Sequence, residues 1–223
     1  MDTYLEIGQK RVFAAALDWP GWSRSGRDED AALQALLDYA SRYAAVAQRA
    51  GLPFAPPDST AAFTIMERLP GGATTDFGAP GEIPASDRRP LGSAELARFG
   101  ALLAACWSVY DTIAAAAAGV ELRKGPRGGG RELGAITHHV LEAEQGYLSR
   151  LAWKIDKRQA TNLNEEMRLT RQAIMDALAA AERSELPERG PRGGVIWPAR
   201  YFVRRVAWHV LDHAWEIVDR SSW

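Results

Sequence analysis

The pattern of hydrophobic and polar positions divides the chain into a short mixed segment and a longer helical one. Alternating β-forming side chains over residues 3–17 predict a hairpin, with Gly8-Gln9-Lys10 as its turn. The Pro-Gly pair within residues 19–22 ends that hairpin. A helical stripe then predicts a helix over residues 28–50, and residues 63–69 return as a strand. These elements make a small β-β-α-β unit.

The remainder of the chain has helical periodicity after a Gly- and Pro-rich stretch. Residues 70–92 hold few large apolar side chains, so we expect a loop there. Four long helices follow, with Gly-rich or Pro-rich connections near 125–130 and 187–194, and we expect them over residues 93–119, 131–154, 162–184 and 198–220. Four helices of this length indicate a four-helix bundle. The predicted fold class is therefore mainly α with a small α+β N-terminal part.

Composition adds limits to this picture. We expect a small α+β unit over residues 1–70, a linker loop over 71–91 and the bundle over 92–223. The net charge of −1 and the scattered basic residues argue against a nucleic-acid partner. A single cysteine, Cys106, rules out an internal disulfide. No secretory signal or membrane-length apolar run is visible, so we expect a cytoplasmic protein without membrane association.

The four histidines lie in only two of the predicted helices, at positions 138, 139, 209 and 213. His209 and His213 are four residues apart, which puts them about 40° apart on one helix face. That face also carries apolar residues, so both imidazoles point toward the core. A shared cation would offset the cost of burying them, and this spacing is found in helical zinc sites. Taken alone, however, such a pair is more often an ordinary surface or core feature.

The second helix of the bundle holds the other two histidines, and one of them is expected to be a third metal ligand. His138 shares its face with polar residues, which predicts a rim or surface position. His139 has small neighbours that leave room for a pocket, namely Ala135, Ala143 and Gly146. We therefore expect His139, His209 and His213 to hold a metal. Three protein nitrogens with one open position is the pattern of catalytic zinc.

Two stretches carry a resemblance to a known family. Residues Ile136–Glu144, followed by Tyr147-Leu148, resemble the second helix of the DinB/YfiT-like superfamily, in which a glutamate follows a histidine by five residues. Residues Arg204–His213 resemble its last helix, with the matching histidine pair. The resemblance covers about residues 92–220. It implies a divalent metal, zinc or nickel, held at positions that match His139, His209 and His213.

The resemblance also implies an activity. Relatives include mycothiol-dependent maleylpyruvate isomerase and bacillithiol S-transferases, in which a low-molecular-weight thiol binds at the metal. The first hypothesis is thus a metal-dependent transferase or isomerase that uses such a thiol on a small-molecule substrate.

The N-terminal 70 residues resemble HicB-like antitoxin domains, which implies a partner surface, a homodimer contact or a cover over the pocket. The alternative is a non-catalytic binding or regulatory module with a structural or vestigial metal site.

Other polar residues have two interpretations each. Glu144 is a candidate catalytic residue, either as an acceptor for a ligand's N–H or as a base, although an ion pair with a bundle arginine explains it equally well. Tyr201, Arg204 and Arg205 could meet an anionic substrate, but a solvated helix face is the simpler account. Cys106 is expected to be structural.

Overall fold

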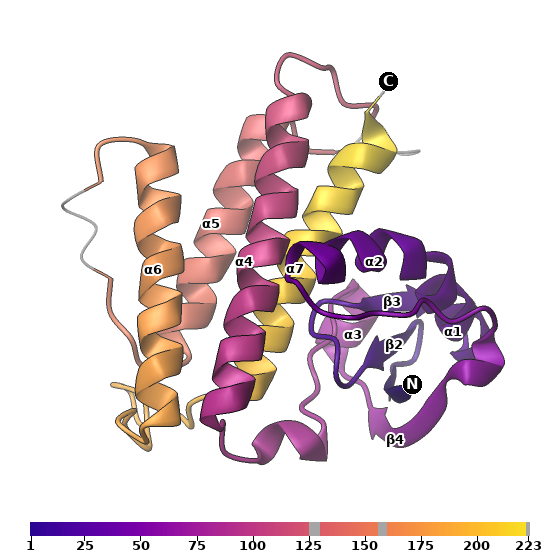
Figure 1. Ribbon diagram of the computed structural model, residues 1–223, viewed down its shortest axis with the longest axis horizontal. Helices are drawn as coiled ribbons and strands as arrows, with labels where there is room; N and C mark the ends of the chain where they lie inside the picture. The colour runs from indigo at the N-terminus through magenta and orange to yellow at the C-terminus, as the bar shows by residue number, and fades with distance from the viewer. Residues whose placement is uncertain (125–129, 156–159, 222–223) are drawn as a thin grey trace.

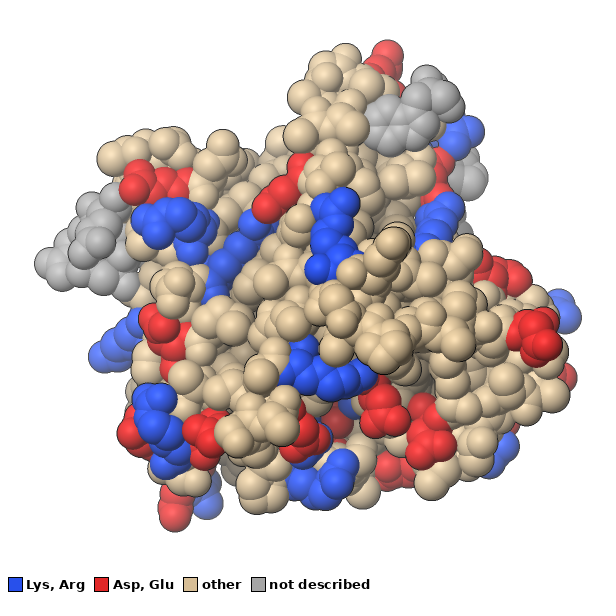
Figure 2. Space-filling view, in the orientation of Figure 1, with Lys and Arg blue, Asp and Glu red and all other residues tan. Residues whose placement is uncertain are grey.

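The computed structural model describes residues 1–124, 130–155 and 160–221. An N-terminal α+β unit packs beside four long helices that run side by side (Figure 1). This arrangement confirms the predicted fold class, mainly α with a small α+β part at the N-terminus. Apolar residues of both parts join in one buried core. Figure 2 shows acidic and basic side chains intermixed on the face drawn.

The N-terminal unit is built on a four-stranded sheet in the order β3-β2-β1-β4. Its strands are β1 (Asp2–Ile7), β2 (Val12–Ala16), β3 (Ser23–Gly26) and β4 (Thr64–Pro70). β1 pairs antiparallel with β2 and parallel with β4, so the expected hairpin and returning strand are both present. All five residues of β2 are buried, which makes this strand part of the core.

The unit contains more elements than the expected β-β-α-β order. β3 is an additional strand, which its short polar sequence concealed because no large apolar side chains alternate along it. The expected helix over residues 28–50 is two helices, α1 (Glu29–Asp38) and α2 (Ala40–Arg49). They divide at Tyr39, whose ring lies beside Trp215 and whose hydroxyl donates to Asp219. These contacts with the last helix outweigh local helix propensity.

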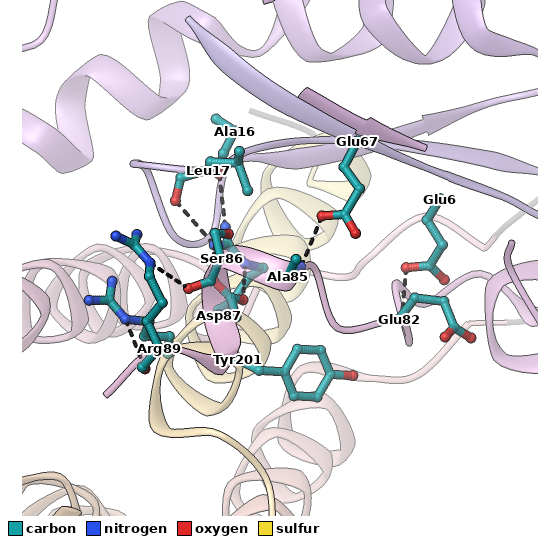
Figure 3. Close-up of polar contacts among 12 residues, drawn as sticks. Glu6, Ala16, Leu17, Glu67, Glu82, Ala85, Ser86, Asp87, Arg89 and Tyr201 are labelled. Atoms are coloured by element: carbon teal, nitrogen blue, oxygen red, sulfur yellow. Dashed lines mark hydrogen bonds and ion pairs between the residues drawn. The ribbon is translucent and has the colours of Figure 1, made fainter. Parts of the chain in front are cut away.

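The expectation of a plain loop over residues 70–92 is wrong. This segment contains α3 (Ala73–Phe77) and a 3₁₀ turn over Ala85–Arg88, and a second 3₁₀ turn, Thr60–Ala62, precedes β4. The buried carboxylate of Glu6 organises the segment, because it accepts hydrogen bonds from the Thr75 hydroxyl and from the backbone amides of Gly81 and Glu82. Figure 3 shows the contact between Glu6 and Glu82. Because Glu6 lies far from this segment in the sequence, the composition of residues 70–92 alone could not predict its structure.

Four helices form the C-terminal part, namely α4 (Ser93–Ala116), α5 (Leu133–Ser149), α6 (Leu163–Glu182) and α7 (Ala199–Arg220). α7 packs against α4 and α5, and α6 closes the ring by packing against α5 and α4. The Asn162 side chain caps α6 by accepting from the Glu165 amide. α5 ends at Ser149 instead of the expected residue 154, and Ala152 just beyond it has a positive φ of 57°. The expected connection at 125–130 lies, except for Gly130, outside the described residues.

α4 is long and apolar enough to cross a membrane by length and composition. However, 44% of its apolar window is buried inside the protein, and its neighbours are α7, α6 and α2. The core helix of a bundle has the same composition, and this packing gives α4 that place.

The two parts meet at Arg204 of α7, which is buried. Its guanidinium donates to both carboxylate oxygens of Asp87 at 2.8 Å and to the carbonyls of Ala16 and Leu17 at 2.8 and 3.1 Å. Figure 3 shows Ala16, Leu17 and Asp87 gathered at this point. One side chain of the last helix therefore joins the sheet and the 85–88 turn to the bundle.

Candidate metal centre

Three histidines from two helices meet where α5 packs against α7. His139, His209 and His213 each offer a ring nitrogen, and these nitrogens all lie within 4.8 Å of one another. The Nε2 atoms of His139 and His209 are 3.2 Å apart. Two ligands of a tetrahedral zinc ion, each bound at roughly 2.0–2.1 Å, lie about 3.3 Å apart. The spacing of this pair therefore fits a shared cation.

The local fold explains why these side chains converge. His209 and His213 lie one turn apart on α7 and are only 7% and 8% exposed. His139 faces them from α5 and is half-buried, whereas His138 is exposed, as its polar face predicts. The three rings pack edge to face or tilted, with centroids 4.5–5.0 Å apart. The cluster is thus closed on the side of α7 and more open on the side of α5.

The surroundings favour the neutral form of two of the three imidazoles, those of His209 and His139. Burial lowers the pKa of His209 well below its usual range, and the nearby His213 and His139 lower it further. Burial also lowers the pKa of His139. Neutral imidazole is the form that binds metals. An N–H···N hydrogen bond between His139 and His209 is the alternative account of their contact, and it needs the same neutral state.

Glu216 also belongs to this cluster. Its Oε2 lies 2.7 Å from Nδ1 of His213, and its Oε1 accepts from Arg220 at 2.6 Å. The bond to His213 lowers the pKa of Glu216, which stays ionised. Carboxylates that orient a histidine through its other nitrogen are typical of metal sites. The signal in the sequence was the three-residue spacing from His213 to Glu216, which puts both on one helix face.

Glu144, the candidate catalytic residue, lies on a different side of α5. It follows His139 by five residues, which turns it about 140° around the helix. Its Oε1 accepts from the indole of Trp107 on α4 at 2.6 Å. Within the described residues no hydrogen bond or ion pair joins Glu144 to the three histidines. The structure therefore does not bring Glu144 into the cluster.

Other candidate residues have structural positions. Cys106 is fully buried, and burial raises the pKa of its thiol, so it is an inert part of the core. The expectation of a solvated face at Tyr201, Arg204 and Arg205 is wrong, since all three are buried. Trp208 of α7 packs edge-on against Phe13 of the sheet.

No protein-family model, curated protein or solved structure matches this chain. The resemblances to the DinB/YfiT-like superfamily and to HicB-like domains therefore remain predictions based on the quoted motifs.

Proposed function

We propose that this protein is a divalent-metal-dependent enzyme of the DinB-like class, in which His139, His209 and His213 hold Zn²⁺ or Ni²⁺. The observation that carries the proposal is the convergence of three imidazoles from two helices in one half-open cluster. Three protein nitrogens leave a coordination position for a ligand, which is the catalytic pattern. Four protein ligands would indicate a structural site.

The chain's own residues would orient and shield this centre. Glu216 holds the ring of His213 so that its other nitrogen faces the cluster. The Tyr147 ring lies perpendicular to the His209 ring, with the two centroids 5.8 Å apart, and flanks the cluster. When bound, the metal would lower the pKa of a low-molecular-weight thiol, as an S-transferase or thiol-dependent isomerase requires. A cytoplasmic location suits this chemistry because thiols stay reduced there.

Metal stoichiometry tests the ligand set. The tag-free protein, loaded with Zn²⁺ or Ni²⁺ and desalted, should retain about one equivalent of metal by elemental analysis. His213→Ala should lower that to about a tenth of an equivalent or less, because two imidazoles bind far more weakly than three. His138→Ala is the matched control, since the neighbouring exposed histidine lies outside the cluster, and it should retain the full equivalent.

Two results would contradict the proposal. Wild-type protein that retains no metal after loading would show that there is no metal site. Full retention by His213→Ala would show that the ligands are different residues. Catalysis is tested by turnover of electrophiles with a panel of bacterial thiols. A metal-loaded protein that turns over none of them would favour the alternative, a non-catalytic binding module.

A further inference from the structure

Arg205 is a buried cation without an acidic partner among the described residues. Its side chain begins one turn before His209 on α7, and the residue is 7% exposed. One guanidinium nitrogen donates to the Pro80 carbonyl and another to the Tyr147 hydroxyl at 3.1 Å, while Nε is buried with no hydrogen-bond partner in the described chain. Burying a charge without a counter-ion is costly. The presence of the unpaired Arg205 guanidinium at this buried position therefore needs an explanation.

The other buried arginines of the same helix show the contrast. Arg200 pairs with Glu95, and Arg204 pairs with Asp87. The buried carboxylate of Glu6 does not pair with Arg205, because it accepts instead from Thr75 and from the amides of Gly81 and Glu82. The neighbours of Arg205 are instead two aromatic faces, at 5.2 Å from the Tyr147 centroid and 5.0 Å from the Trp208 centroid. Aromatic faces stabilise a cation but leave its charge uncompensated.

Tyr147 extends this arrangement to the candidate metal centre. Its hydroxyl accepts from Arg205, and its own proton is donated to no residue in the described chain. The hydroxyl proton is therefore available for a ligand. The indole nitrogen of Trp208 is a further buried donor without a partner among these residues.

We propose that Tyr147 and Arg205 form an anion subsite beside the three histidines, which takes a carboxylate of the substrate. The Tyr147 hydroxyl donates to the carboxylate, and Arg205 supplies the compensating positive charge. One turn of helix, about 6 Å of rise, separates Arg205 from His209, so the subsite lies next to the histidine cluster. This inference rests on the proposed function and narrows its substrates to small carboxylic acids.

A titration of the metal-free full-length chain tests the subsite without any metal. We would add acetate and follow the ¹⁵N–¹H resonance of the Trp208 indole, assigned with Trp208→Phe. Acetate should shift this resonance saturably, whereas acetamide, of similar shape but uncharged, should not. Tyr147→Phe should weaken acetate binding about tenfold, because it removes the donor. Arg205→Gln should abolish the shift, and Arg183→Gln, at an exposed site, should leave it unchanged.

Several outcomes would overturn the subsite. These are an equal response to acetamide, an unchanged acetate affinity in Tyr147→Phe, or saturation by inorganic phosphate in preference to acetate. Tyr147→Phe keeps the ring and removes one oxygen, so it tests the proposal even where Arg205→Gln does not fold. Absence of metal binding would overturn the proposed function while leaving the acetate result intact. Absence of the acetate response with full metal loading would overturn only the subsite.

Discussion

Glu144 illustrates how burial sets the chemistry of a single carboxyl group. The side chain is fully buried; Trp107 donates to one oxygen, and the other oxygen has no partner among the described residues. Burial raises the pKa of Glu144 to about 7, against the opposing effects of Arg171 and of the Trp107 hydrogen bond. Near pH 6 the folded protein therefore keeps a proton that the unfolded chain has released.

The stability of the protein should depend on pH through this group. Because the folded pKa is raised, its contribution is complete below about pH 4.5 and is lost as the pH rises through about 7. Glu144→Gln keeps an acceptor for Trp107 and removes the ionisation. Relative to wild type, the variant should gain up to about 3 kcal/mol of unfolding free energy between pH 5 and pH 8.

Urea denaturation at these two pH values measures that gain. Glu142→Gln, at an exposed position of the same helix, should follow the wild-type pH dependence. A constant difference between Glu144→Gln and wild type at both pH values would show that the carboxyl does not hold the extra proton.

At the scale of elements, the contact between the N-terminal unit and α7 depends on a close backbone approach. Gly21 has a φ of +95°, and a Cβ added there would lie 2.9 Å from a methyl group of Leu211 and 3.0 Å from the Cβ of Ala207. The turn between β2 and β3 can therefore lie directly on the helix only because this residue has no side chain.

Gly21→Ala should destabilise the protein by about 3 kcal/mol, because it combines backbone strain with a collision against α7. The matched control is Gly51→Ala. Gly51 also has a positive φ, of 69°, but a Cβ there meets nothing within 4 Å. It should cost only about 1 kcal/mol. Chemical denaturation measures both losses. Equal losses of unfolding free energy would show that backbone strain alone is responsible and that the residues of α7 move aside at little cost.

At the scale of the whole molecule, the buried pair of Arg204 and Asp87 makes the two parts of the chain depend on each other. Burial alone would lower the pKa of Arg204, but the Asp87 carboxylate more than offsets this and raises it. Asp87→Asn should destabilise the protein by about 3–5 kcal/mol, because it leaves the guanidinium buried without its counter-ion.

The measurement is urea unfolding, followed by tryptophan fluorescence and far-UV circular dichroism. Glu185→Gln, which removes an exposed pair with Arg183, is expected to leave the midpoint unchanged. Should Asp87→Asn unfold at the wild-type midpoint, the junction would not stabilise the fold.

Local patterns predicted the parts of this protein that repeat at short spacing. The four long helices follow from apolar periodicity, and the histidine pair of α7 follows from its four-residue spacing. The division of the helix at Tyr39 and the order in residues 73–88 depend on Asp219 and Glu6, which are distant in sequence. Arg205 was misjudged for a similar reason: helix phase does not reveal that the Pro80 carbonyl lies over it.

The burial of α7 also restricts how this sequence can change over evolutionary time. Within Ala199–Arg220, all of which the structure describes, only Asp219 is exposed, and even its carboxylate accepts from Tyr39 and Arg42. A helix that contacts protein on every side has few neutral substitutions. We expect distant descendants of this gene to diverge first in α6 and in the connections, and to keep the last helix longest.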